Sequence, residues 1–143
     1  MAAFKNSAPQ RSPAPRNVRR FTLEQANRSL PLVRRIVTDI VKAHALASAR
    51  RDALEQATGT KDAAIAQQSL EMAIERLEDL VDELEDVGAE LKDYQSGLVD
   101  FVGRHEGRDV YLCWKLGEES ITHWHELDAG FAGRKPVSLL REK

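Results

Sequence analysis

Two histidines separated by one residue are the feature of this sequence with the clearest chemical potential. His123 and His125 flank Trp124 in a segment whose composition is typical of a β-strand. Alternate side chains of a strand leave the same face of the sheet, so both imidazoles should project together, with roughly 7 Å between their backbones. This spacing suits two ligands of one metal ion.

A metal site built on this pair needs a third ligand, and His44 is the leading candidate. It occupies a core position in a helical pattern, so its side chain is expected to point inward. Three histidines and one open position would be typical of a catalytic zinc or iron site. Histidines beside a packed sheet are more often core residues satisfied by carbonyl or carboxylate groups, and a lone core histidine often sets helix register. Both interpretations stay open.

Several residues near the pair could orient a histidine or contact a ligand. Glu126 and Asp128 can accept a hydrogen bond from the second nitrogen of an imidazole. The other residues predicted in this neighbourhood are Trp124, Tyr111, Asp100 and Arg134. Cys113 is predicted on the opposite face from the histidines, hence without a base, and we expect it to be a small packing residue.

Three short strands are predicted to position these residues, at 97–102, 109–114 and 121–125, separated by turns that contain glycine. A short loop at Gly117 and Glu118 predicts that Leu112 lies opposite His123 and Val110 opposite His125. The histidines would then share an apolar face with Val99, Phe101, Val110, Leu112, Trp114 and Ile121. The other face would carry Asp100, Asp109, Tyr111, Cys113, Trp124 and Glu126.

The sequence before the strands has the periodicity of two long helices. Apolar residues recur at alternating spacings of three and four through 30–54 and again through 70–94, on either side of Gly59. This pattern predicts an antiparallel hairpin, whose second helix takes Asp62 as its cap. The second apolar stripe is wider than one partner needs, so a third layer or a second subunit should cover Leu80, Val87 and Tyr94.

A short helix is predicted before the hairpin. Thr22 and Gln25 match a capping box, which indicates a helix over about 22–28. Ser29, followed by Pro31, is typical of a second helix start. The predicted ordered domain is therefore α+β over 21–137, with helices over 21–95, a three-stranded antiparallel β-meander over 97–126, a C-terminal loop over 127–137 and a tail over 138–143.

The ends of the chain differ in charge from the rest. The first 20 residues contain five basic residues and no acidic one, so the remaining 123 carry −7 within a total of −2. Three prolines and the absence of hydrophobic periodicity predict that 1–20 is a disordered basic tail. Nucleic-acid binding is expected at most weakly and through this tail, because the body is acidic.

Composition excludes several classes of protein. At 143 residues the chain has room for one domain, and a single cysteine excludes disulfide scaffolds and all-cysteine metal clusters. No stretch has the roughly 18 apolar residues of a membrane span, so no membrane partner is expected.

Four segments together resemble a known family. They are FTLEQAN (21–27), GLVDF (97–101), GRDVYLCWKLGE (107–118) and WHELDAGFAGR (124–134). The chain is similar over about 21–137 to a family of small bacterial and archaeal proteins catalogued as a domain of unknown function. This resemblance implies a cytoplasmic, single-domain protein and assigns no residue a role.

Two functions follow as hypotheses. The first is a non-enzymatic binding or assembly module that forms a homo-oligomer, with a dimer favoured, through surplus helical surface. The second is a metal-dependent enzyme, most plausibly a hydrolase, with zinc or iron held by His123, His125 and His44.

Overall fold

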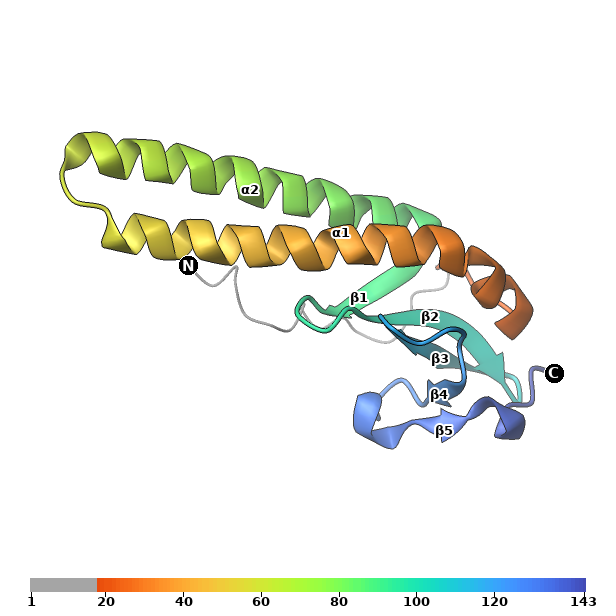
Figure 1. Cartoon of the computed structure of the whole chain (residues 1–143). Coiled ribbons are helices and arrows are strands. Elements are labelled where there is room, and N and C mark those ends of the chain that lie inside the picture. Colours follow the sequence, from red (N-terminus) through yellow and green to blue (C-terminus); the bar gives the residue numbers. More distant parts are fainter. Residues whose placement is uncertain (1–17) are drawn as a thin grey trace.

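A helical hairpin packed on one antiparallel sheet makes up the computed structural model, which describes residues 18–143 (Figure 1). The expectation for the basic tail therefore lies, apart from its last three residues, outside the described residues. Helices α1 (Leu23–Gln56) and α2 (Thr60–Val87) form the hairpin. The strands are β1 (Ala89–Asp93), β2 (Leu98–His105), β3 (Arg108–Lys115), β4 (His123–His125) and β5 (Lys135–Pro136).

The first helix begins at the predicted capping box but is not divided. The side chain of Thr22 accepts from the Gln25 backbone N–H, and the Gln25 side chain accepts from the Thr22 N–H. The predicted second start at Ser29 is wrong, because the Ser29 hydroxyl donates to the carbonyl of Ala26, inside a continuous helix. Pro31 therefore lies in the helix interior, where it lacks a donor and tends to bend the axis. The first turns of α1 are tilted from the rest (Figure 1).

The second helix is shorter at its C-terminal end than its apolar spacing predicts. Its N-cap is Gly59 rather than Asp62, and it ends at Gly88, whose φ of 108° is left-handed. Residues 89–93, predicted as helix, form strand β1 instead. Their alternation of apolar and charged residues also fits a strand, and the glycine cap decides between the two.

The sheet has five strands in the order β1-β2-β3-β4-β5, not the three predicted. The three predicted strands correspond to β2, β3 and β4, and the pairing of Phe101 with Leu112 places their apolar residues on one face as expected. The two additional strands lie at the edges. β1 lies where the apolar spacing predicts helix, and β5 is a pair of residues in the predicted C-terminal loop.

The register between β3 and β4 differs by one residue from the prediction. Tyr111 pairs with His125 and Cys113 with His123, so both histidines lie on the face opposite to the one expected. Trp124 takes their place and pairs with Leu112 on the apolar face. The cause is the connection over 116–122, which is not a tight hairpin loop. In it, the Glu118 side chain accepts from the Lys115 N–H and the Glu118 carbonyl accepts from Trp114 Nε1.

The sheet is the third layer that covers the wide apolar stripe of α2. Leu80 is 3% exposed, and Val87 and Tyr94 pack against the same core. We call the face that joins this core the inner face, and the opposite face the outer face. The inner face includes Val99, Phe101, Val110, Leu112, Trp114 and Trp124. No described helix is long and apolar enough to cross a membrane.

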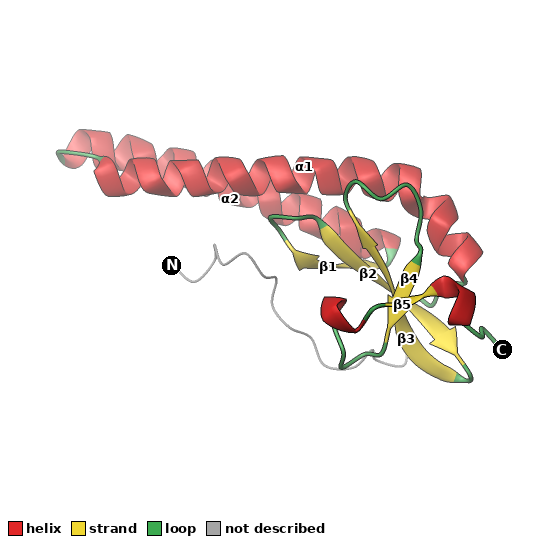
Figure 2. Cartoon of the chain, turned by 60° about the horizontal axis from the view of Figure 1, so that its bottom comes forward, coloured by secondary structure: helices red, strands yellow, loops and turns green. Residues whose placement is uncertain are grey.

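The free end of the hairpin extends past the sheet, whereas the start of α1 and the C-terminal segment lie together at the other end (Figures 1 and 2). Both predicted tails contribute contacts there. Arg20 forms an ion pair with Asp109, with Nε and Oδ1 2.9 Å apart, and the Phe21 N–H donates to the Val102 carbonyl. The Glu106 N–H donates to the Arg141 carbonyl. Residues on both sides of the predicted domain, 21–137, thus contact the folded part of the chain.

Candidate functional site

Buried polar residues from three neighbouring strands meet on the outer face of the sheet. β2 supplies Asp100, β3 supplies Cys113, which pairs with Asp100, and β4 supplies His125. Their exposed fractions are 3%, 0% and 2%. One oxygen of Asp100, Cys113 Sγ and one ring nitrogen of His125 all lie within 4.8 Å of one another. This cluster, the Asp100–Cys113–His125 cluster, is the candidate site.

His125 has a defined tautomer at its first nitrogen. Nδ1 lies 2.7 Å from the Glu126 carbonyl, which can only accept, so Nδ1 carries a proton. Nε2 lies 3.1 and 3.2 Å from the two carboxylate oxygens of Asp100. Two carboxylate oxygens at this distance favour a proton on Nε2, so Asp100 stabilises the imidazolium form of His125.

The Asp100 carboxylate favours the protonated form of His125, whereas burial of the ring opposes it. Burial is the largest single influence on the pKa of His125 and lowers it, because a charged ring loses its hydration. The hydrogen bond that His125 donates to Asp100, the negative charge of Asp100 and the hydrogen bond to the Glu126 carbonyl together outweigh burial, so the pKa of His125 is raised above its ordinary value.

Cys113 is held as a neutral thiol. Burial, followed by the charge and the hydrogen bond of Asp100, raises its pKa to about 12. The prediction that it lies on the opposite face from the histidines is wrong, because of the shift in register. Even so, its thiol interacts with Asp100 rather than being activated by an imidazole, and a thiol with so high a pKa is a poor nucleophile.

The other two predicted metal ligands lie elsewhere. His123 is on the outer face but partly exposed, and its Nδ1 lies 2.9 Å from the Thr122 hydroxyl. His44 is buried on α1, on the inner side of the sheet, and stacks on Tyr94 with ring centroids 5.0 Å apart. Among residues 18–143, the three ligand atoms that converge come from Asp100, Cys113 and His125.

The residues predicted around the pair are divided between the two faces and the surface. The Tyr111 ring lies 5.4 Å from His125, beside the cluster. Trp124 is on the inner face and its Nε1 donates to the Pro136 carbonyl. Arg134 Nη2 donates to both carboxylate oxygens of Glu118, and Asp128 is exposed.

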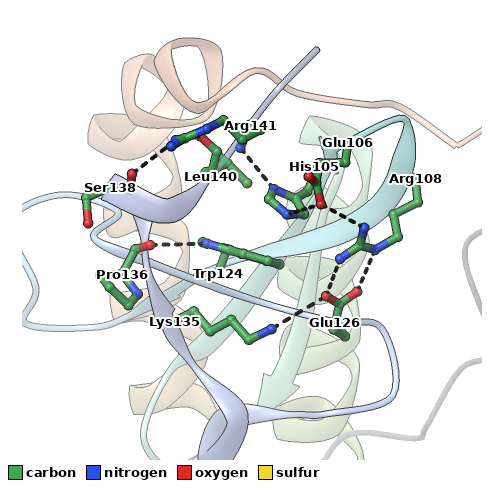
Figure 3. A network of polar contacts seen from close by, with 10 residues as sticks. All are labelled: His105, Glu106, Arg108, Trp124, Glu126, Lys135, Pro136, Ser138, Leu140 and Arg141. Atoms are coloured by element: carbon green, nitrogen blue, oxygen red, sulfur yellow. Dashed lines mark hydrogen bonds and ion pairs between the residues drawn. The ribbon is translucent and has the colours of Figure 1, made fainter.

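Glu126 belongs to a second polar network, which sequence reasoning missed (Figure 3). Its carboxylate accepts two hydrogen bonds from Arg108, at 3.0 and 2.7 Å. These contacts with Arg108, and the charge of Lys135, hold the pKa of Glu126 below its usual range despite some desolvation. No signal in the local sequence indicated this pairing, because it depends on the register of β4.

His105 fastens the C-terminal segment to the end of β2 in the same network. Its Nδ1 accepts from the Arg141 N–H at 2.9 Å, while Nε2 faces Glu106 Oε1 at 3.0 Å (Figure 3). Its ring lies on Trp124, with centroids 4.4 Å apart. The network therefore connects β2 and β4 to the C-terminal segment.

A family model agrees with the resemblance of the four segments. The model, described as an uncharacterized conserved protein (DUF2203), matches residues 19–137. The chain belongs to the DUF2203 family. All the strands of the DUF2203 sheet and both helices of the hairpin lie within this match. Comparison with curated proteins gives no match for this DUF2203 chain, and neither does comparison with solved structures.

Proposed function

We propose that this DUF2203 protein is a non-enzymatic assembly module that dimerises through the free end of its helical hairpin. The observation that carries the proposal is a group of large apolar side chains exposed there. Leu46 on α1 is 47% exposed, and Ile65 and Met72 on α2 are 59% and 66% exposed. In water such side chains favour a partner surface, because burial of apolar area is the main driving force of association.

Ile65 lines a groove between the two helices, and the spacing of Leu46 and Met72 along α1 and α2 places them at its end. The groove has a volume of about 350 Å³ and is lined by Arg50, Ala53, Ala57, Asp62, Ile65, Ala66 and Ser69. Leu46 precedes Arg50 by four positions and Met72 follows Ser69 by three, so each continues the groove by one helical turn. Its small alanines would let a second helix approach closely.

A second copy of the chain is the partner that the charges of the groove fit. Arg50 and Asp62 lie on the same groove, with opposite charges. In a two-fold symmetric pair, the same surface is used twice, so Arg50 of one copy can face Asp62 of the other. Two hairpins paired in this way would form a four-helix arrangement. Each free end, which extends past its own sheet, would then be covered by the hairpin of the other copy.

The burial of the Asp100–Cys113–His125 cluster favours a structural role for it over catalysis. Asp100, Cys113 and His125 are each at most 3% exposed, and the thiol is neutral. A substrate needs access to the reacting atoms, and a nucleophile needs an activating base. Neither requirement is met by this arrangement, whereas the exposed hairpin end meets the requirement for association.

Sedimentation velocity at micromolar concentrations tests the proposal. We expect a species of twice the chain mass of 16.0 kDa, and we expect Leu46→Lys and Ile65→Lys to shift it to the monomer. Leu32→Lys is the matched control, because Leu32 is also on α1, 39% exposed, but lies at the sheet end of the hairpin. A wild-type chain that stays monomeric throughout the range contradicts the proposal, as does a control that dissociates equally.

A further inference from the structure

The Asp100–Cys113–His125 cluster has the composition and arrangement of a metal site. We infer that these three residues bind one zinc ion, which ties β2, β3 and β4 together. Zinc ligands at about 2.0–2.3 Å from the ion lie roughly 3.3–3.8 Å from one another. His125 Nε2 and the Asp100 oxygens are already 3.1–3.2 Å apart. All three ligand atoms lie within 4.8 Å, so small side-chain rotations complete the site.

His125 is oriented in the way that a metal-binding imidazole requires. Its Nδ1–H donates to the backbone carbonyl of Glu126 at 2.7 Å, which leaves Nε2 as the nitrogen that faces the cluster. Ligand histidines are commonly held by such a bond from the second nitrogen to a carbonyl or carboxylate. The ring therefore needs no new anchor when Nε2 exchanges its contact with Asp100 for the metal.

Charge balance favours a divalent ion at this buried position. A zinc ion with one thiolate, one carboxylate and one neutral imidazole has no net charge, which avoids a large cost of burial. Binding releases two protons, one from the Cys113 thiol and the one shared by His125 and Asp100. A thiolate and an imidazole select zinc over calcium or magnesium, which prefer oxygen ligands.

The positive side chains near the cluster are themselves compensated. The Arg134 charge acts on Cys113, but both Glu118 oxygens accept from Arg134, at 2.9 and 3.0 Å. The Lys92 charge acts on His125, and Lys92 Nζ lies 3.9 Å from Glu90 Oε2 and 4.4 Å from the centre of the Tyr111 ring. These partners reduce the repulsion that a bound cation would experience.

Zinc at this position would be structural, because both oxygens of Asp100, Cys113 Sγ and His125 Nε2 together offer four donor atoms. The ligands come from three adjacent strands, and β4 has only three residues with which to hold its place in the sheet. A metal that links β4 through His125 to β2 through Asp100 would stabilise the short strand. An ion that binds the folded chain in preference to the unfolded one stabilises the folded state, so zinc should raise the melting temperature.

Cobalt substitution of the full chain gives a direct test, because a cobalt–thiolate bond has a charge-transfer absorption in the near ultraviolet. We expect one equivalent of Co²⁺ to produce this absorption and one equivalent of Zn²⁺ to displace it. Cys113 is the single cysteine of the chain, so the band identifies the ligand. Cys113→Ser should abolish the band, and Asp100→Asn should weaken binding by at least about 100-fold.

The matched control is His123→Gln, because His123 lies on the same strand and face but outside the cluster. It should bind cobalt as the wild type does. The inference is overturned if wild-type protein takes up less than one equivalent of either ion, or if the bound cobalt has no thiolate band. Loss of binding in His123→Gln would also overturn the assigned ligands. Because the wild-type spectrum alone decides the first two outcomes, a variant that fails to fold leaves the test intact.

Discussion

The backbone N–H of Leu23 donates to the Glu142 side chain, with Oε2 at 2.8 Å, so a residue near the C-terminal end of the chain caps the first helix. The first four N–H groups of a helix lack partners within it, and a carboxylate also interacts favourably with the positive end of the helix dipole. Two side chains therefore cap the start of α1. One is Thr22, which belongs to the capping box, and the other is Glu142, from a segment far away in the sequence.

Removing this second cap should destabilise the protein measurably. We expect Glu142→Ala to lower the free energy of unfolding by about 1 kcal/mol, the usual effect of losing a helix N-terminal acceptor. Urea denaturation followed by circular dichroism measures the change. Lys143→Ala, a substitution at the exposed neighbouring residue, should have little effect, and equal losses in the two variants would argue against a role for the cap.

A side chain at Gly88 should destabilise the turn between α2 and β1. The φ of Gly88 is 108°, and a Cβ there would lie 3.0 Å from Arg19 Cδ and 3.1 Å from the Phe21 ring. Gly117 has a similar φ of 106° but open space around it, so Gly117→Ala isolates the cost of the backbone conformation, about 1–2 kcal/mol. Gly88→Ala should cost a further 1–3 kcal/mol, roughly, from crowding. Similar denaturation midpoints for the two variants would contradict this.

Acid should weaken the fold through His44. Burial lowers its pKa from 6.5, the Arg51 charge lowers it further, and the Asp93 charge opposes both without reversing the direction. Above pH 6.5 His44 is mostly neutral in both states. As the pH falls below 6.5, the unfolded chain gains a proton that the folded chain resists, so stability is lost. Replacing His44 should remove this part of the pH dependence.

Paired denaturation curves at about pH 7.5 and pH 5 measure that effect. His44→Gln should lose less free energy of unfolding between the two pH values than the wild type does. Ala45→Gln serves as the control, because Ala45 is the exposed neighbour of His44 and has no titratable group, and the pH dependence of this variant should match the wild type. If His44→Gln and the wild type respond identically to acid, His44 has no such role.

The thiol of Cys113 should resist alkylation in the folded, metal-free chain. Its side chain is buried, with a pKa of about 12, so very little thiolate is present at about pH 8. We expect iodoacetamide to react at least about 100-fold more slowly than with the same chain in urea. Mass spectrometry of timed samples measures the rates, and a folded-state rate near that of a free thiol would contradict the burial and hydrogen bonding of Cys113.

Secondary-structure elements that depend on residues close together in the sequence could be predicted from it. The capping box of Thr22 and Gln25 lies within four residues, and the apolar spacing of α1 depends on one helix and its neighbour. The end of α2 was harder to predict. Leu91 continues the apolar spacing of the helix, and it fits the inner face of a strand equally well. The left-handed conformation of Gly88 decides between these possibilities, and a glycine alone does not specify it.

Prediction of the candidate site required a longer-range feature, the register of β4. Prediction of a polar outer face with Asp100 and Cys113 was correct, because strand alternation fixes it. The placement of His125 required the register of β4, which follows from how Glu118 folds the connection against Lys115 and Trp114. A shift of one residue exchanges Trp124 with the histidines, and it changes the ligands that His125 can meet from other histidines to Asp100 and Cys113.

The last strand also limits how this molecule can associate. β5 consists of Lys135 and Pro136 only, so this edge of the sheet offers few backbone groups, and proline supplies no N–H for pairing. A short edge with lysine and proline discourages growth of the sheet by addition of a strand from another molecule. At that edge the sheet is therefore protected against aggregation by strand addition.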